Sequence, residues 1–212
     1  MDPIPARSGC RACRDAEPLG FDFTMAFQPI VNTAEGRVFA HEALVRGLDG
    51  GGAGPLLARV NESNRYQFDQ RCRVKAIELA ARLDMQSALS INFMPNAVYR
   101  PDLCIRTTLE IADAVGFPID RIIFEITEGE RVDDLQHLRG IVEHYQSQGF
   151  KTAIDDFGAG YAGLNLLADL RTDLDKLDMA LVRNIDQDRG RRAIVRGILQ
   201  VCNELLIDVI AE

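Results

Sequence analysis

Several features that mark broad classes of protein are missing from this chain. The N-terminus has no apolar core of the kind found in signal peptides, and no window of the 212 residues approaches about 18 uncharged apolar residues. Positive charge is also scarce, because 24 Lys and Arg stand against 32 Asp and Glu, for a net charge of −8. These absences argue against a secretory signal, a membrane span, a coat on DNA or RNA polymers and electrostatic docking on anionic lipid.

Cysteine is scarce, and its number is odd, with five residues in the chain. Cys72, Cys104 and Cys202 are scattered among apolar runs, so we expect reduced core thiols in a cytoplasmic protein. Cys10 and Cys13 have the spacing of a zinc knuckle or a redox pair, but no second pair accompanies them. An unstructured tail is therefore the favoured interpretation of the segment that carries them.

The chain is typical of a short polar tail followed by one globular domain. Residues 1–20 contain three prolines and are expected to form the tail, and residues 21–212 are long enough to bury a substantial core. Seven strands are expected, at 23–31, 37–46, 88–93, 121–127, 151–156, 174–179 and 207–212. Helices are expected at 56–83, 102–115, 132–148, 164–169 and 189–206. A hairpin followed by β–α alternation predicts an α/β fold with a mostly parallel sheet, either open and doubly wound or closed as a (β/α)8 barrel.

Polar side chains gather at the carboxyl ends of six expected strands. The set is Glu42, Asn92, Glu125, Asp155, Asp156, Lys176 and Glu212. Barrels of the (β/α)8 type place their active sites at this end of the strands. Period-two alternation also puts Glu42, Leu44 and Arg46 on one face of their strand.

This set of residues suggests metal-assisted chemistry on a phosphate. Carboxylate and amide oxygens suit Mg²⁺ or Mn²⁺ rather than zinc. Adjacent aspartates can bind two ions about 4 Å apart, which is the arrangement that clamps a phosphoryl displacement. Arg46 could bind a phosphate with its guanidinium fork, and Lys176 could hold or activate the attacking water.

The stretch KTAIDDFGAGYAGL, residues 151–164, contains a glycine pattern with two possible meanings. Its three glycines spell G-x-G-x-x-G after an expected strand, as in dinucleotide-binding folds. However, Asp155 and Asp156 directly precede the glycines and would repel a pyrophosphate, and the helix that follows is too short for that fold. We therefore interpret the stretch as a metal site with a loop that hinges beside it.

Seven segments then occur in a recognisable order, namely FQPIV, HEALVRG, LSINF, FEITEGE, AIDDFGAGYAGL, LDKLD and VIAE. In order and spacing they resemble the EAL domain family of bacterial cyclic di-GMP phosphodiesterases, over about residues 23–212. The resemblance implies a (β/α)8 TIM-type barrel whose first strand is antiparallel. It implies hydrolysis of one phosphodiester bond of cyclic di-GMP to linear pGpG, which lowers a second messenger in signalling. The chain stops at Glu212, so the last strand and helix of that barrel are expected to be missing from it.

The resemblance also implies roles for individual residues. Two divalent cations, Mg²⁺ or Mn²⁺, would be held by Glu42, Asn92, Glu125, Asp155 and Asp156, and Ca²⁺ is expected to inhibit because its looser coordination misplaces the water. The catalytic positions would be Lys176 beside the nucleophilic water, Glu212, and Glu128, which steadies the loop after the aspartate pair. The substrate contacts would be Gln28, Leu44 and Arg46. A homodimer through the loop after the fifth strand is a further implication.

Two other functions stay open from the sequence. The first is a non-catalytic receptor that binds cyclic di-GMP and acts through a protein partner. Receptors in the family usually lose metal ligands or the glutamate of the EAL motif, and this chain keeps both, which favours the enzyme. The second is a fragment that neither binds nor cleaves the dinucleotide.

Overall fold

The structure is a computed structural model that describes residues 19–98, 100–127, 134–159 and 163–212. The chain divides into two compact units, with the boundary between Ile123 and Phe124. The predictions for Cys10, Cys13 and Glu128 fall outside the described residues.

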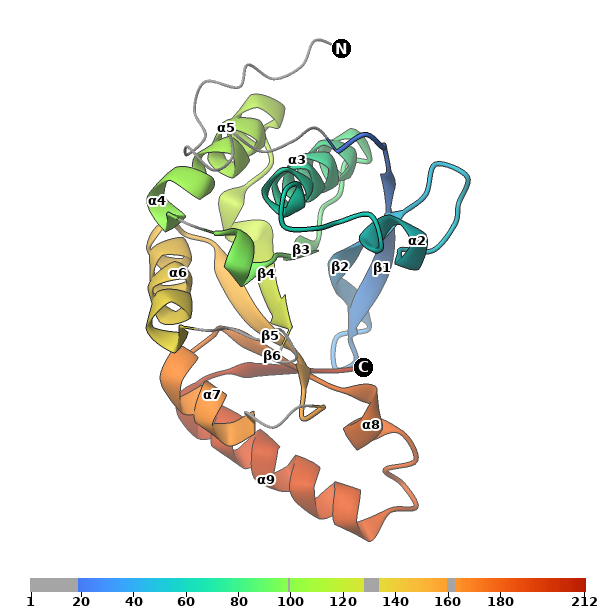
Figure 1. The fold of residues 1–212 in the computed structure, drawn as a ribbon. Coiled ribbons are helices and arrows are strands. Elements are labelled where there is room, and N and C mark those ends of the chain that lie inside the picture. The colour runs from blue at the N-terminus through green and yellow to red at the C-terminus, as the bar shows by residue number, and fades with distance from the viewer. Residues whose placement is uncertain (1–18, 99, 128–133, 160–162) are drawn as a thin grey trace. The chain divides into compact units, whose positions relative to one another are not determined.

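The first unit begins with a β-hairpin (Figure 1). Strand β1 (Thr24–Asn32) pairs antiparallel with β2 (Arg37–Arg46), and β3 (Ala88–Asn92) pairs parallel with β2. The turn of the hairpin is set by Asn32, whose side-chain Oδ1 accepts hydrogen bonds from two backbone N–H groups of the turn at 3.0 and 3.1 Å. The antiparallel first strand expected from the sequence is therefore confirmed.

The helices of the first unit are shorter than the sequence predicts. They are α2 (Gly54–Leu57), α3 (Arg65–Arg82), η1 (Pro95–Ala97), α4 (Pro101–Cys104), α5 (Arg106–Val115) and η2 (Ile119–Arg121). The helix expected over 56–83 is wrong for residues 58–64. There the side chains of Asn61 and Asn64 each accept a backbone N–H at 2.9 Å, and such local bonds compete with the helical ladder.

The second unit continues the alternation of strands and helices (Figure 1). Strand β4 (Ile122–Thr127) crosses the boundary, and it is followed by β5 (Lys151–Phe157), β6 (Leu174–Leu177) and β7 (Asp208–Ala211). Strands β5 and β6 pair parallel, as do β6 and β7. The helices are α6 (Leu135–Ser147), α7 (Gly163–Leu170), α8 (Met179–Val182) and α9 (Arg189–Leu205).

One expected strand of the second unit ends early. The sequence predicts a strand over 174–179, but β6 ends at Leu177. Asp178 caps α8 instead, because its carboxylate accepts the backbone N–H of Ala180 at 2.7 Å. This cap turns the chain away from the sheet two residues after Lys176.

The core of the second unit contains a cluster of aromatic rings. Phe124 lies with its ring centroid 5.0 Å from that of Tyr145 and 5.1 Å from that of Phe150. The three rings join β4 to α6 and to the start of β5, and their separations are typical of favourable aromatic pairs. This packing fixes the strands that carry Glu125 and Asp155.

Several expectations about the whole chain are met. Seven strands lie within the described residues, as the sequence predicts. Cys72, Cys104 and Cys202 are free and buried, as predicted for core thiols. Within the part of the chain that the structure describes, no helix combines the length and apolar character needed to cross a membrane.

Candidate active site

In the first unit, several predicted residues share one face of the hairpin. Gln28 lies directly opposite Glu42 in the β1–β2 register, so both side chains leave the same face of the sheet. Leu44 and Arg46 continue along that face at period two. A guanidinium N–H of Arg46 donates to the carbonyl of the preceding residue at 2.8 Å, which uses one of its five donors.

Asn92 joins this group from the neighbouring strand β3. Its Nδ2 donates a hydrogen bond to Oε1 of Glu42 at 3.0 Å. This bond fixes the orientation of the amide. Its nitrogen faces Glu42, and its oxygen, the atom that can bind a cation, points away from the bonded oxygen of Glu42. The structure thus brings together Glu42 and Asn92, two of the predicted metal ligands.

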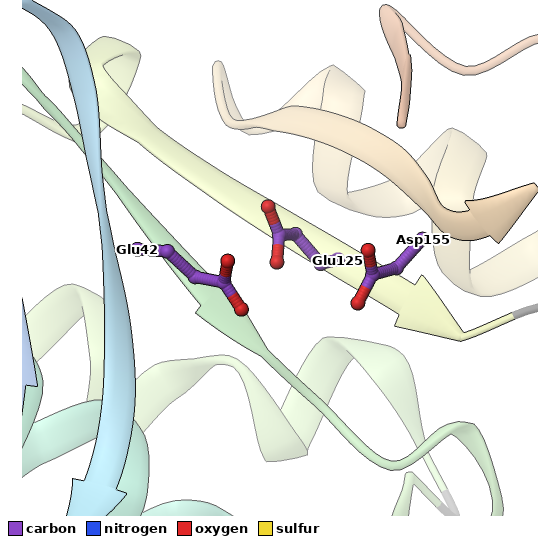
Figure 2. A group of neighbouring side chains, drawn as sticks. All are labelled: Glu42, Glu125 and Asp155. Carbon is purple, nitrogen blue, oxygen red and sulfur yellow. The ribbon is translucent and has the colours of Figure 1, made fainter. Parts of the chain in front are cut away.

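In the second unit, Lys176 lies between three carboxylates. Its Nζ is 3.2 Å from Oε2 of Glu125, 2.8 Å from Oδ1 of Asp155 and 2.7 Å from Oε1 of Glu212. Figure 2 shows two of these acids, Glu125 on β4 and Asp155 on β5, and also draws Glu42 on β2. Lys176 itself is only 1% exposed, so these ion pairs are largely shielded from water.

The acids determine the protonation state of Lys176. Burial alone would lower the pKa of the amine, but the charges of Glu125 and Asp155 and the bonds to Asp155 and Glu212 outweigh burial and raise the pKa above its usual range. The side chain is therefore held as a cation by its acids. As a cation, it can donate a hydrogen bond to a water or a phosphate oxygen.

Asp155 and Asp156 reach the same cluster because β5 is irregular at this point. In a regular strand, consecutive side chains point to opposite faces of the sheet. Here the register with β6 shifts between Ile154 and Phe157, and Asp156 takes a φ of 55°. One carboxylate oxygen each from Asp155, Asp156 and Glu212 lies within 4.8 Å of the other two. A bulge in the strand therefore makes both adjacent aspartates available to one site.

This cluster has the chemistry of a divalent-cation site. Its ligand atoms are all carboxylate oxygens, which Mg²⁺, Mn²⁺ and Ca²⁺ prefer. Within the described residues, the ammonium of Lys176 contacts Glu125, Asp155 and Glu212, and an oxygen of Asp156 lies close to those of Asp155 and Glu212. Carboxylates held this close together repel one another, and a bound cation would relieve that repulsion. The residues present therefore fit a divalent cation.

The first glycine of the G-x-G-x-x-G pattern has a structural cause. Gly158 takes a φ of +96°, and a Cβ there would lie 2.3 Å from Cδ1 of Leu181 on α8. The backbone angle favours glycine at this position, and a Cβ would also push the Leu181 side chain aside. The pattern thus needs no dinucleotide to explain its first glycine, which agrees with the rejection of the dinucleotide-binding fingerprint.

A buried acid behind the cluster was missed by the sequence analysis. Asp175 precedes Lys176 on β6 and is fully buried. Its carboxylate accepts the Thr172 hydroxyl at 3.0 Å and lies 3.7 Å from Sγ of Cys202. Burial raises the pKa of Asp175 to about 7, although these bonds oppose the rise. The sequence did contain an indication of this buried acid. Asp175 and Lys176 are adjacent in a four-residue strand, so their charged side chains point to opposite faces of the sheet.

Comparison with known protein families gives a match over nearly the whole chain. The model of the EAL domain family matches residues 14–212. Among solved structures, a standalone versatile EAL protein from Vibrio cholerae O395, in its c-di-GMP-bound form, is 58% identical with a TM-score of 0.87, covering 90% of this chain and 81% of that one. The manganese and cyclic di-GMP complex of BlrP1 from Klebsiella pneumoniae is 32% identical with a TM-score of 0.83, covering 98% and 50%.

Two curated relatives come from Escherichia coli strain K12. The blue light- and temperature-regulated antirepressor BluF is 28% identical over 88% of this chain and 46% of the relative. The probable cyclic di-GMP phosphodiesterase PdeG is 27% identical over 95% of this chain and 40% of the relative. The chain thus spans less than half the length of either relative.

Proposed function

Because this chain belongs to the EAL domain family, we propose that it hydrolyses one phosphodiester bond of cyclic di-GMP and releases linear pGpG. The observation that carries the proposal is the cluster of Asp155, Asp156 and Glu212 oxygens within 4.8 Å, made possible by the bulge in β5. The cyclic di-GMP complexes of the Vibrio and Klebsiella proteins and the name of PdeG support the choice of substrate and reaction.

The proposed cation ligands are those expected from the sequence. Two divalent cations, Mg²⁺ or Mn²⁺, are proposed to bind Glu42, Asn92, Glu125, Asp155 and Asp156. When bound, such cations neutralise charge on the phosphate and lower the pKa of a bound water. The manganese complex of BlrP1 supports this choice of cation. We further propose that the strands of this chain belong to a (β/α)8 barrel, in which these ligands meet at the carboxyl ends of the strands.

The remaining residues would orient the reactants. Lys176, held as a cation by its acids, would donate a hydrogen bond to the attacking water. Glu212 keeps the ammonium in place from 2.7 Å, and Glu128 is proposed to steady the loop after β5. Gln28, Leu44 and Arg46 would contact the dinucleotide. The oxygen of the water then joins the phosphorus as the bond to the 3′ oxygen breaks, and that oxygen leaves with a proton.

The choice of cation tests the proposal. Purified protein is freed of metal with EDTA and then incubated with cyclic di-GMP and Mg²⁺, Mn²⁺ or Ca²⁺ in turn, and pGpG is measured by chromatography. We expect product with Mg²⁺ and Mn²⁺, and little or none with Ca²⁺, whose looser coordination misplaces the water. Equal turnover with Ca²⁺ would contradict the proposed site, and intact dinucleotide in every arm would contradict the enzyme.

A non-catalytic receptor for cyclic di-GMP is the alternative function. The relation to BluF, which is named as an antirepressor and not as an enzyme, favours it. Under this alternative, equilibrium dialysis would show cyclic di-GMP retained by the protein and recovered uncleaved. The full set of proposed ligands in this chain favours the enzyme.

The sequence also predicts a location and an assembly. We propose a cytoplasmic location, which the free buried thiols of Cys72, Cys104 and Cys202 support. We also propose a homodimer through the loop after β5, part of which lies outside the described residues. Light scattering of the purified protein tests the dimer directly.

A further inference from the structure

The end of strand β3 is held by a buried acid on helix α3. Asp69 is 2% exposed, and its Oδ1 accepts the backbone N–H of Met94 at 2.9 Å. Met94 follows Asn92, the last residue of β3, by two residues and directly precedes η1. The contact therefore joins α3 to the segment directly after the proposed cation ligand.

The second oxygen of Asp69 forms an ion pair with Arg73, one turn later on α3. Arg73 is 1% exposed, so both charges are buried. A buried carboxylate without a partner is strongly unfavourable, and the guanidinium supplies the compensating charge. The Asp69 carboxylate thus binds both the guanidinium of Arg73 on α3 and the backbone N–H of Met94 after β3.

Asn92 lies between two backbone anchors. On one side, the pairing of β3 with β2 extends as far as Ile91, opposite Ala43. On the other side, two residues after Asn92, the backbone N–H of Met94 is held by Asp69. The bond from Asp69 to Met94 therefore helps to set where the Asn92 amide lies relative to Glu42.

We propose that Asp69, supported by Arg73, is a positioning residue that sets the Asn92 amide for cation binding. The inference rests on the proposed function, because it takes Asn92 as a cation ligand. Asp69 itself touches neither cation nor substrate. Partners of this kind that orient a metal ligand typically change metal affinity by about 10- to 100-fold when they are removed.

Two double variants isolate the contact. D69N/R73M keeps an acceptor oxygen for the Met94 N–H, whereas D69L/R73M has a side chain of similar shape with no acceptor. Both remove the charge of Arg73 together with that of Asp69, which avoids an unpaired buried ion. The two proteins therefore differ in whether the side chain at position 69 can accept the Met94 N–H.

Mn²⁺ binding without substrate, followed by electron paramagnetic resonance, is the first measurement. We expect D69L/R73M to bind Mn²⁺ about 10- to 100-fold more weakly than D69N/R73M, whose affinity stays near that of the wild type. Turnover of the leucine variant should recover at saturating Mn²⁺. Equal Mn²⁺ affinity in the two double variants would overturn the inference.

A second variant, M94P, removes the donor instead of the acceptor. Met94 has φ −96° and ψ 106°, an extended conformation whose φ lies about 30° from the value that proline prefers. The same loss of Mn²⁺ affinity is expected, and wild-type affinity in M94P would also overturn the inference. A wild-type protein that binds no Mn²⁺ would contradict both the proposed function and this inference. An active wild type whose variants keep wild-type Mn²⁺ affinity would contradict this inference alone.

Discussion

Among single residues, Lys176 forms ion pairs with three carboxylates of the second unit. Replacing it by methionine leaves Glu125 and Asp155 buried without their ammonium partner. We expect K176M to lose about 3–5 kcal/mol of unfolding free energy in EDTA, measured by urea denaturation. Added Mg²⁺ should restore part of this loss, because a bound cation supplies the missing positive charge.

The matched control for this change is K151M, because Lys151 is exposed at the start of β5. Loss of an exposed lysine should change the unfolding free energy by no more than about 0.5 kcal/mol. If K176M proves as stable in EDTA as K151M, the ion pairs of Lys176 do not hold the cluster together as described.

A second prediction at this level concerns Glu42. E42A removes a proposed cation ligand and the acceptor of the Asn92 amide bond. Turnover at fixed Mn²⁺ should fall by at least about 100-fold, more than the usual effect of residues that only orient a ligand. E35A, which removes an exposed acid from the turn of the same hairpin, is the control and should leave turnover unchanged. Unchanged turnover in E42A would remove it from the site.

Among the secondary-structure elements, the bulge and turn at the end of β5 are the most sensitive to substitution. G158A forces a methyl group toward Leu181 at a backbone angle that only glycine adopts readily. We expect a loss of about 1–3 kcal/mol in unfolding free energy, together with weaker cation binding as the aspartates shift. G52A serves as the control, because a Cβ there meets nothing within 4 Å. Equal stabilities of the two variants would contradict this account of Gly158.

The same elements show how far the sequence could predict the structure. Hydrophobic periodicity predicted all seven strands, and alternation placed Glu42, Leu44 and Arg46 on one face. It failed at residues 58–64 and after Leu177, where asparagine and aspartate side chains take backbone donors and end or interrupt an element. Such local competition depends on side-chain geometry, which a periodic pattern does not contain.

The sequence predicted which residues form the candidate site, but only part of how their side chains are arranged. The acids at the strand ends were identified, but regular alternation would have put Asp155 and Asp156 on opposite faces. The bulge that unites them depends on a positive φ at Asp156 and on a register shift against β6. The contact from Asp69 to Met94 joins residues 25 apart in sequence, and no local pattern indicates such a contact.

For the molecule as a whole, the buried acid Asp175 predicts how stability depends on pH. Its pKa is about 7 in the folded protein against an ordinary value of 3.8, so between these values the folded state keeps a proton that the unfolded state loses. Stability should therefore fall as pH rises from about 4 to about 7 and then level off. D175N keeps the acceptor for Thr172 without the charge.

We expect D175N to flatten this pH dependence and to be more stable than the wild type by about 2–4 kcal/mol at pH 8. Urea denaturation in EDTA at pH 5 and pH 8 measures both proteins. D178N, which removes the half-buried cap charge at the start of α8, is the control and should keep the wild-type profile. Parallel pH profiles for D175N and the wild type would show that Asp175 is already ionised in the folded protein.

The most direct test of the proposed hydrolysis follows the oxygen of water. Wild-type protein is incubated with cyclic di-GMP and Mn²⁺ in water enriched in oxygen-18, and the products are weighed by mass spectrometry. We expect pGpG with one heavy oxygen on its 5′-phosphate, formed at a rate that EDTA abolishes and fresh Mn²⁺ restores. Cyclic di-GMP that remains intact and bound, or cleavage that EDTA leaves unchanged, would contradict a metal-dependent phosphodiesterase.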